Sequence, residues 1–208
     1  MRIDSLKNTP DRAGRYWVTF EDGTKLGLYR QTVEDFGLYI GRELTEKEHS
    51  SLLAAAGKMS AKMRAVRIVS ASSVSRRDLE ERLVRKGEDP DQAKEAVQWM
   101  EDLHLVDDRS TAEQVVHSCI SKGYGLARAK QALYEKRIPK EYWEEALEDY
   151  PDQMDRIASF LRSRLDADSD QKQIKKAIDS LIRRGHSYSN IRRALNDLSF
   201  DSEEYIED

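Results

Sequence analysis

The sequence predicts a mainly α-helical protein, a tandem array of three three-helix repeats preceded by a small β-hairpin-plus-helix module. A shift of fifty residues places Leu83 on Leu133 and Gly87 on Arg137, and a further shift of 48 residues reaches Leu181. The apolar residues around each leucine recur at helical spacing, and a period near fifty residues is typical of stacked helical units. Charged residues make up 36% of the chain and hydrophobic residues 38%, which suits an array whose layers each bury one thin apolar stripe.

Residues 1–44 lie outside the repeat and are expected to form an N-terminal module. The segments 15–20 (RYWVTF) and 24–29 (TKLGLY) are rich in residues favoured in β-strands, and Asp22-Gly23 between them allows the positive φ values of a tight hairpin turn. A two-stranded hairpin is marginally stable by itself, so the module is expected to pack against the helix that follows it.

Two further elements complete this expected module. Residues 2–6 are a candidate third strand. Residues 32–38 (TVEDFGL) predict one short helix with Val33, Phe36 and Leu38 turned inward. The expected role of the module is scaffolding or contact with a partner.

The next predicted element is a long helix that joins the module to the first repeat. Thr45 and Glu48 form a capping box, which opens a helix that runs to about Ser70. Gly57 inside this helix costs about 1 kcal/mol relative to alanine, which leaves room for a bend or a break near it.

Nine helices are expected in three repeats. Prolines at positions 90 and 139 fit the first turn of a helix, where an N–H group needs no partner. The expected helices are 60–70, 75–86 and 90–104, then 108–121, 125–136 and 139–149, then 152–165, 170–184 and 187–198. The expected domains are the N-terminal module at 1–44, the linking helix with the first repeat at 45–106, the second repeat at 107–150, the third repeat at 151–198 and an acidic tail at 199–208.

The net charge is −4, which argues against a protein covered by nucleic acid, but the basic residues are grouped. Lysine and arginine outnumber the acids by eight to three at 61–86, by six to one at 120–140 and by seven to one at 171–193. Recurrence once per repeat predicts a continuous basic stripe. The alternative, that these charges only keep the helices in solution, stays open.

The residue types that often carry catalysis are expected to be structural here. Lys122-Gly-Tyr-Gly125 lacks the strand and the Lys-Ser/Thr of a phosphate loop, so its glycines are expected to end one helix and release the next. Asp107 and Asp108 could bind a cation, but an aspartate at such a junction is expected to cap a helix. None of the four histidines has a cysteine or carboxylate partner at the spacing of metal ligands; they are His49, His104, His117 and His186. The sequence therefore predicts a protein that is not an enzyme and that uses neither a cofactor nor a metal.

Cys119 lies in an apolar helix pattern and is expected to be a small buried residue. No apolar run approaches the roughly 18 residues of a membrane span, and the N-terminus has no hydrophobic signal core. The expected protein is soluble, cytoplasmic and monomeric, without contact to a membrane.

Three motifs in a fixed order resemble the RecX family. They are a Ser-x-x-x-Leu-x-x-x-Leu-x-x-Lys-Gly helix that begins at Ser75, a Leu-Val-Asp-Asp-Arg junction at 105–109 and the Lys-Gly-Tyr-Gly turn at 122–125. The likeness covers about residues 60–198, and the hairpin module looks similar to the start of some relatives. The chain departs from the family pattern at 71–73 (Ala-Ser-Ser), where relatives usually carry a basic pair.

The resemblance implies a regulator of the RecA recombinase. RecX proteins lie along the groove of the RecA filament on single-stranded DNA, block the addition of subunits and lower the ATPase, strand-exchange and coprotease activities. The implied partner is therefore the RecA filament, with the single-stranded DNA inside it as a second expected contact. The implied mechanism is steric and electrostatic, and it places the protein in DNA repair, DNA recombination and the SOS response.

The candidate partner-binding residues are the bases of the three clusters and one tyrosine beside them. They are Arg76, Arg77, Arg82 and Lys86 in the first repeat, Lys122, Tyr124, Arg128, Lys130, Lys136 and Arg137 in the second, and Lys175, Arg183, Arg184, Arg192 and Arg193 in the third. Tyr188 is a further candidate for an exposed contact. Arg128 is expected to share a helix face with Lys136 better than with Lys130, because residues two apart differ by about 200°.

A DNA-binding module of the helix-turn-helix type is the open alternative. Three-helix units with a basic middle helix fit such a module superficially. The basic residues recur over three repeats instead of gathering on one recognition helix, and the acidic total weakens affinity for bare DNA.

Overall fold

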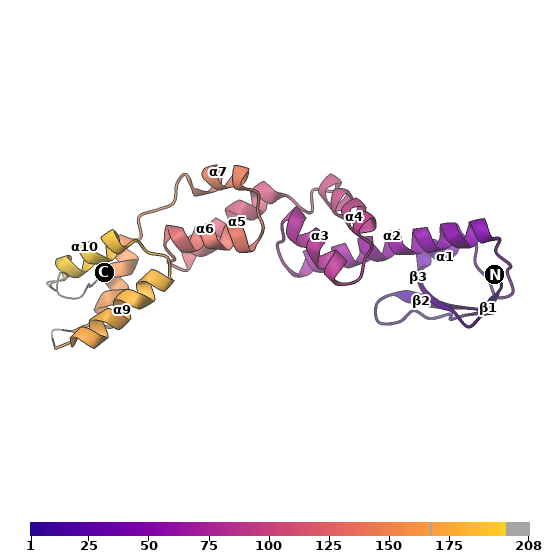
Figure 1. Cartoon of the computed structure of the whole chain (residues 1–208), viewed down its shortest axis with the longest axis horizontal. Helices are drawn as coiled ribbons and strands as arrows, with labels where there is room; N and C mark the ends of the chain where they lie inside the picture. The colour runs from indigo at the N-terminus through magenta and orange to yellow at the C-terminus, as the bar shows by residue number, and fades with distance from the viewer. Residues whose placement is uncertain (167, 199–208) are drawn as a thin grey trace. The chain divides into compact units, whose positions relative to one another are not determined.

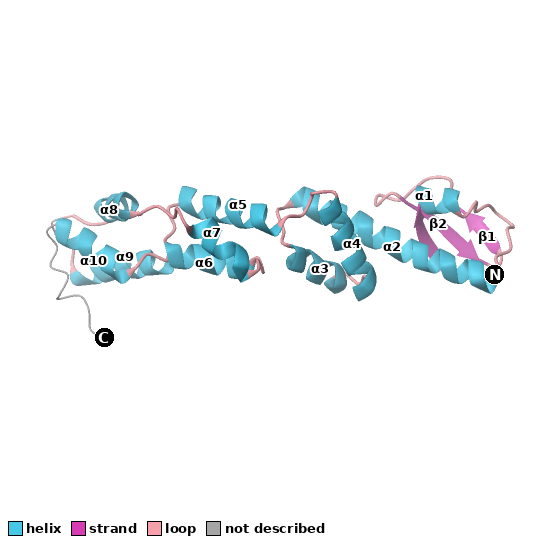
Figure 2. Ribbon diagram, turned by 90° about the horizontal axis from the view of Figure 1, so that it is seen from above, coloured by secondary structure: helices cyan, strands magenta, loops and turns pink. Residues whose placement is uncertain are grey.

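The structure is a computed structural model that describes residues 1–166 and 168–198. The chain forms two compact units, Met1–Val106 and Asp107–Asp208. Both units are mainly helical, and the first also contains a three-stranded antiparallel sheet (Figure 2). The predicted fold class is confirmed, whereas the predicted acidic tail at 199–208 lies outside the described residues.

The first unit begins with a sheet whose strands follow the order β1-β2-β3 (Figure 1). The strands are β1 (Ile3–Leu6), β2 (Arg15–Phe20) and β3 (Lys25–Tyr29). Trp17 lies opposite Gly27 and Val18 opposite Leu26, and Gly23 adopts a φ of +82° in the turn between these strands. The predicted hairpin and its third strand are both confirmed.

The apolar face of the sheet packs against helix α2 (Glu46–Ala71). Phe20 from the sheet and Leu52 from the helix are buried in one cluster. Further along the same helix, Arg67 donates a hydrogen bond to the hydroxyl of Tyr29. The long helix is therefore the second layer that a small sheet needs for stability.

The short helix of the module, α1 (Arg30–Asp35), begins two residues earlier and ends three residues earlier than the sequence predicted. Phe36 is its C-cap, and Gly37 follows with a φ of +53°, which ends the helix. Leu38 is buried in the core of the module although it lies beyond the helix, and Val33 and Phe36 pack half-buried against that core.

Helix α2 runs unbroken through Gly57, so this glycine does not break it. Its predicted capping box is confirmed: the Thr45 side chain accepts from the Glu48 N–H, and the Glu48 carboxylate accepts from the Thr45 N–H. A Cβ at Gly57 would lie 2.3 Å from the Gln92 Oε1 atom of helix α4 (Pro90–Asp102). This glycine therefore admits a side chain of the neighbouring helix without breaking its own helix.

The first repeat combines the C-terminal part of α2 with α3 (Arg76–Arg85) and α4. Leu79 and Leu83 of α3 are fully buried, and they share a core with Met100 of α4. Trp99 packs half-buried against the same core. The helices of this repeat thus lie where the apolar periodicity predicted them.

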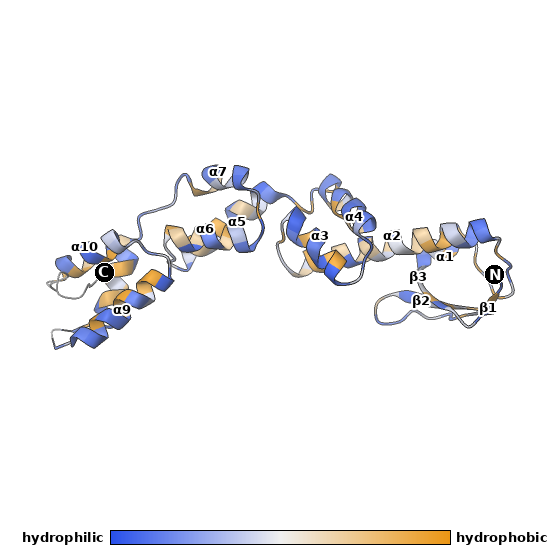
Figure 3. Ribbon diagram, viewed as in Figure 1, coloured by the Kyte–Doolittle hydropathy of each residue, from blue (hydrophilic) through white to orange (hydrophobic). Residues whose placement is uncertain are grey.

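The second unit contains the other two repeats. Its elements are α5 (Asp108–Ser121), α6 (Leu126–Glu135), the 3₁₀ turn η1 (Lys140–Tyr142), α7 (Trp143–Leu147), α8 (Met154–Arg162), α9 (Gln171–Arg183) and α10 (Tyr188–Asp197). Along α9, apolar and hydrophilic residues alternate at helical intervals (Figure 3). Leu133 and Leu181 are 0% and 1% exposed, which confirms that they occupy buried positions equivalent to that of Leu83.

The continuous helix predicted at 139–149 is wrong, because η1 and the five-residue helix α7 take its place. The Tyr142 N–H donates to the Pro139 carbonyl, a bond that spans three residues instead of four. The indole N–H of Trp143 donates to the Ile138 carbonyl over 3.0 Å, so this tryptophan packs back onto the start of its own segment.

Candidate functional site

The middle helices of the three repeats, α3, α6 and α9, end in the same way. In each, the C-cap is a base (Lys86, Lys136 or Arg184), and the residue after it has a positive φ. The N–H of the second residue after the cap donates to the carbonyl of the buried leucine, over 3.1 Å in α3, 3.1 Å in α6 and 3.2 Å in α9. The N–H of the first residue after the cap donates to the carbonyl of the residue that follows this leucine, over 2.9, 2.9 and 2.8 Å in the same helices. This pair of bonds is a Schellman motif, and it places a base at the negative end of each helix dipole.

All candidate residues lie in the described part of the chain, and most are at the surface. The exposed ones are Arg76, Arg77, Lys86, Lys122, Lys130, Arg137, Lys175, Arg183, Arg192 and Arg193, and the half-buried ones are Arg82, Tyr124, Arg128, Lys136 and Arg184. Each repeat therefore presents basic side chains to the solvent.

In the first repeat, carboxylates of the same unit hold three of the candidate arginines. Arg76 lies 2.9 Å from Glu101, and Arg77 lies 3.3 Å from Glu81. Arg82 lies 2.8 Å from the carboxylate of the aspartate one turn before it. Ion pairs at a protein surface contribute little to stability, so a partner can compete for these arginines.

In the second repeat, Arg128 is tied into the protein itself. Its Nη1 atom lies 2.9 Å from Glu135 Oε1, and this hydrogen bond raises the pKa of Arg128 and lowers the pKa of Glu135. A Cβ at Gly185 would lie 2.2 Å from the Arg128 backbone nitrogen, so the start of α6 touches the end of α9. Charge reversal at Arg128 would disturb these internal contacts, which makes Lys130, exposed on the same helix, the cleaner probe.

Arg137 stands in a conformation that favours glycine. It has a φ of +56°, at the position where the first repeat has Gly87 with +91° and the third has Gly185 with +83°. A residue with a Cβ is disfavoured in this region by roughly 1–2 kcal/mol. The repeat alignment placed Arg137 on Gly87, but the positive φ of Arg137 was not predicted from it. The glycines at the aligned positions of the other repeats were the signal for this backbone conformation. Strained residues cluster at functional sites, which strengthens Arg137 as a candidate.

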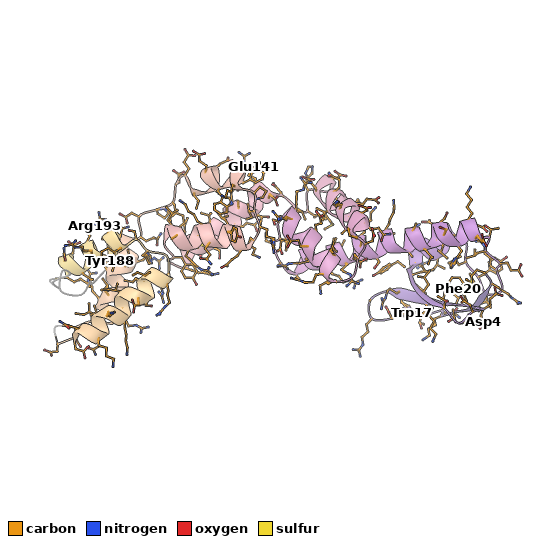
Figure 4. The ribbon with its side chains drawn as sticks, in the orientation of Figure 1. Asp4, Trp17, Phe20, Glu141, Tyr188 and Arg193 are labelled. Atoms are coloured by element: carbon orange, nitrogen blue, oxygen red, sulfur yellow. The ribbon has the colours of Figure 1, made fainter. Side chains whose placement is uncertain are left out.

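In the third repeat, bases come from both α9 and α10. The Arg184 guanidinium lies 4.6 Å from the centroid of the Phe160 ring, and Arg193 lies 3.2 Å from Asp152. Tyr188 and Arg193 both extend from α10 (Figure 4), and Tyr188 is 38% exposed. This repeat therefore presents an aromatic side chain together with its bases.

Backbone hydrogen bonds join the turns of the second and third repeats. The Gly125 N–H donates to the Arg184 carbonyl over 2.9 Å, and the Ala127 N–H donates to the Gly185 carbonyl over 3.2 Å. A Cβ on Gly125 would lie 2.0 Å from the Gly185 carbonyl oxygen, which leaves space for glycine alone. Sequence reasoning predicted that Gly125 begins a helix, which is confirmed, but it missed this contact between repeats.

Two polar side chains flank this junction. His186 is 7% exposed, and its Nε2 atom lies 3.1 Å from the Gly123 carbonyl oxygen. Burial lowers the pKa of His186. Tyr150 donates its hydroxyl to the Tyr124 carbonyl over 2.6 Å, and burial raises the pKa of Tyr150 to about 12. Tyr124 thus contributes its backbone to the junction, besides its half-buried side chain.

The predicted structural roles of two further residues are confirmed. Asp107 caps α5, because its carboxylate accepts from the Arg109 N–H over 2.9 Å. Cys119 is buried, and burial raises the pKa of its thiol. Within residues 1–166 and 168–198, no three His, Cys, Asp or Glu side chains gather as metal ligands would, and none of the helices combines the length and apolar run needed to cross a membrane.

A cavity of about 530 Å³ lies beside the junction of the second and third repeats. Leu126, Tyr150 and Pro151 supply apolar walls, and Lys130 and Gln153 also line it. These walls belong to the same turns that the backbone bonds hold together, so the cavity is part of the contact between the repeats.

Comparison with known proteins gives consistent likenesses. A family model described as the second three-helix domain of RecX matches residues 107–147. The regulatory protein RecX of Clostridioides difficile (strain 630) is 26% identical over 207 residues, which cover 96% of this chain and 96% of the relative. The regulatory protein RecX of Chlorobaculum tepidum is 31% identical over 142 residues, which cover 66% of this chain and 88% of the relative.

Two solved structures share the fold. The crystal structure of a regulatory protein RecX has a TM-score of 0.61 at 20% identity and covers 94% of this chain and 98% of its own. The crystal structure of RecX from Lactobacillus salivarius has a TM-score of 0.60 at 24% identity and covers 70% of this chain and 98% of its own. At these identities the likeness establishes the arrangement of helices and strands alone.

Proposed function

The chain belongs to the RecX family, and from this premise we propose that it binds RecA filaments on single-stranded DNA and inhibits their recombinase, ATPase and coprotease activities. The observation that carries the proposal is the basic helix end, which recurs at the same position of each repeat. A filament of identical subunits offers carboxylates or DNA phosphates at regular intervals. Basic helix ends that recur once per repeat are complementary to such a regular series of negative charges.

The proposed mechanism is binding without covalent chemistry. The exposed bases at and beside these helix ends attract acidic groups of the filament, and the bound protein then blocks the addition of RecA subunits sterically. Attraction between exposed charges is screened over about 8 Å at physiological ionic strength. Inhibition is therefore expected to weaken as the salt concentration rises.

The test is a titration of the protein into RecA assembled on single-stranded DNA, with ATP hydrolysis as the readout. The variant Lys86→Glu/Lys130→Glu/Arg183→Glu reverses three exposed charges, two of them at the ends of α3 and α9, and none of the three forms an ion pair within the described residues. We expect the concentration for half-inhibition to rise roughly tenfold or more, which corresponds to about 1.4 kcal/mol. Lys47→Glu reverses an exposed charge on α2, outside the candidate set, and is the matched control with unchanged potency.

A wild-type protein without effect on the RecA ATPase would contradict the proposal. The helix-turn-helix alternative predicts a different result in the same experiment: binding to naked DNA would be as tight as binding to RecA-coated DNA, with a steep dependence on salt. Tight binding to one duplex sequence would favour that alternative further.

A further inference from the structure

The residue that follows the buried leucine of each middle helix is apolar and exposed. It is Val84 in α3, Tyr134 in α6 and Ile182 in α9, with exposed fractions of 40%, 72% and 48%. Single apolar residues scattered over a surface are common and need no explanation. These three occupy the same place in three equivalent helix ends, so random scatter does not account for them. We call this place the anchor position.

Folding does not require an apolar side chain at the anchor position. The Schellman motif uses the backbone carbonyl of this residue, whereas its apolar contact involves the leucine before it. Helix α4 ends with the same pair of bonds but has Glu101 at this position. Valine and isoleucine are also weaker helix formers than lysine or glutamate. A charged residue would therefore serve the fold at least as well.

Positive charge accompanies the anchor position in every repeat. Of the three residues that follow it, two are always basic: Arg85 and Lys86, Lys136 and Arg137, or Arg183 and Arg184. The third is a glycine in the first and third repeats, and in the second it is Glu135, whose charge Arg128 balances over 2.9 Å. Glu80 and Asp179 lie one turn earlier, farther from the helix end. An apolar side chain beside two bases is complementary to an apolar pocket beside a carboxylate.

We propose that Val84, Tyr134 and Ile182 are three equivalent anchors for a protein partner whose surface repeats an apolar pocket beside a carboxylate. The inference rests on the proposed function, because successive subunits of a filament present the same pocket at regular intervals. Nucleic acid suits the anchors less well, since single strands bind by stacking bases on aromatic rings and two of the three anchors are aliphatic.

Three anchors in one chain multiply each other's effect. Once one anchor is bound, the others meet their pockets at a raised effective concentration. Loss of one anchor is expected to weaken binding roughly tenfold, and loss of all three roughly a thousandfold if their contributions are independent.

The experiment compares Val84→Ser, Tyr134→Ser, Ile182→Ser and the triple variant with the wild type. The dissociation constant is measured by fluorescence anisotropy on RecA filaments and, separately, on naked single-stranded DNA. Leu53→Ser is the matched control, because Leu53 is 45% exposed on α2 but lies outside the anchor position. Thermal melting checks that each variant folds. If a serine variant unfolds, the double variant Val84→Thr/Ile182→Thr replaces it, because threonine keeps the β-branched shape of valine and isoleucine.

We expect the triple variant to melt like the wild type, to bind naked DNA equally and to lose binding to the filament. Wild-type affinity of the folded triple variant for the filament would overturn the inference and leave the proposed function intact. A parallel loss of binding to naked DNA would assign the anchors to nucleic acid and overturn it as well. A wild type that does not bind the filament would instead refute the proposed function, and the protein partner with it.

Discussion

The second and third repeats share a helix pattern but differ in how they are held together. The buried core of the third repeat comprises Ile157, Leu161, Leu165, Ile174, Ala177, Ile178, Leu181, Ile191, Ala194 and Leu195. The core cluster of the second comprises Ala112, Val116, Leu133 and Ile138, with half-buried side chains such as Trp143 around it. The second repeat adds backbone bonds from Gly125 and Ala127 to the third. A repeat with a thin core thus depends on its neighbour, as the nearest-neighbour energetics of repeat proteins allow.

The largest expected effect comes from cavities in the two cores. Leu133→Ala and Leu181→Ala should each reduce the free energy of unfolding by about 2–5 kcal/mol. We expect Leu133→Ala to loosen both its own repeat and the junction, whereas Leu181→Ala loosens mainly the third repeat. Urea melts with residue-resolved hydrogen exchange measure this difference. Small and equal losses in both variants would refute the idea that the second repeat is the weaker one.

Gly185→Ala tests the junction directly. The new Cβ would press against Arg128, which adds roughly 1–3 kcal/mol of overpacking to the roughly 1–2 kcal/mol for a side chain at positive φ. Gly87→Ala is the matched control, because Gly87 has a φ of +91° with no atom within 4 Å of the new Cβ. The measurement is the difference between the two losses of unfolding free energy. Equal losses would mean that the contact between the repeats adds no constraint.

Arg137→Gly should increase the free energy of unfolding, whereas the preceding substitutions reduce it. Glycine relieves the roughly 1–2 kcal/mol of left-handed strain, but its unfolded chain has more freedom, worth roughly 0.5–1 kcal/mol. The expected net gain in unfolding free energy is therefore roughly 0–1.5 kcal/mol, together with weaker inhibition of RecA if the arginine contacts the filament. Thermal melting and the ATPase titration on the same sample separate the two effects. A destabilised variant would show that the arginine side chain supports the fold.

His186 should make the junction sensitive to acid, with the smallest effect of the set. Burial, aided by the nearby charge of Arg184, holds its pKa below the ordinary value of 6.5. The unfolded chain therefore binds a proton more readily, so this contribution to stability is complete above pH 6.5 and is lost as the pH falls through the lowered pKa. Urea midpoints at pH 7.5 and pH 5.5 measure the loss, and His186→Asn should reduce the difference. If the urea midpoints of this variant differed between the two pH values as much as those of the wild type, a group other than His186 would cause the acid sensitivity.

The candidate site was partly visible in the sequence. The bases at the ends of the middle helices followed from the repeat alignment, and they are at the surface because their apolar neighbours occupy the core. The ion pair of Arg128 with Glu135 did not follow, because the two residues are seven apart on their helix, beyond the spacing of three or four at which side-chain pairs are expected. The internal role of His186 was also missed, since its acceptor lies 63 residues earlier in the chain.

The sequence by itself determined the elements of this protein. Apolar spacing specified the helices except at 139–149, Asp22-Gly23 specified the hairpin, and the Thr45 capping box specified the start of α2, because each signal acts within a few residues of the chain. The tertiary structure decided which backbones come into contact. Gly57 admits a side chain from α4, and Gly125 meets the turn at Gly185 sixty residues away. A glycine that bends a helix and one that admits a neighbour look alike in sequence, because the atoms that exclude a side chain belong to distant segments that approach only on folding.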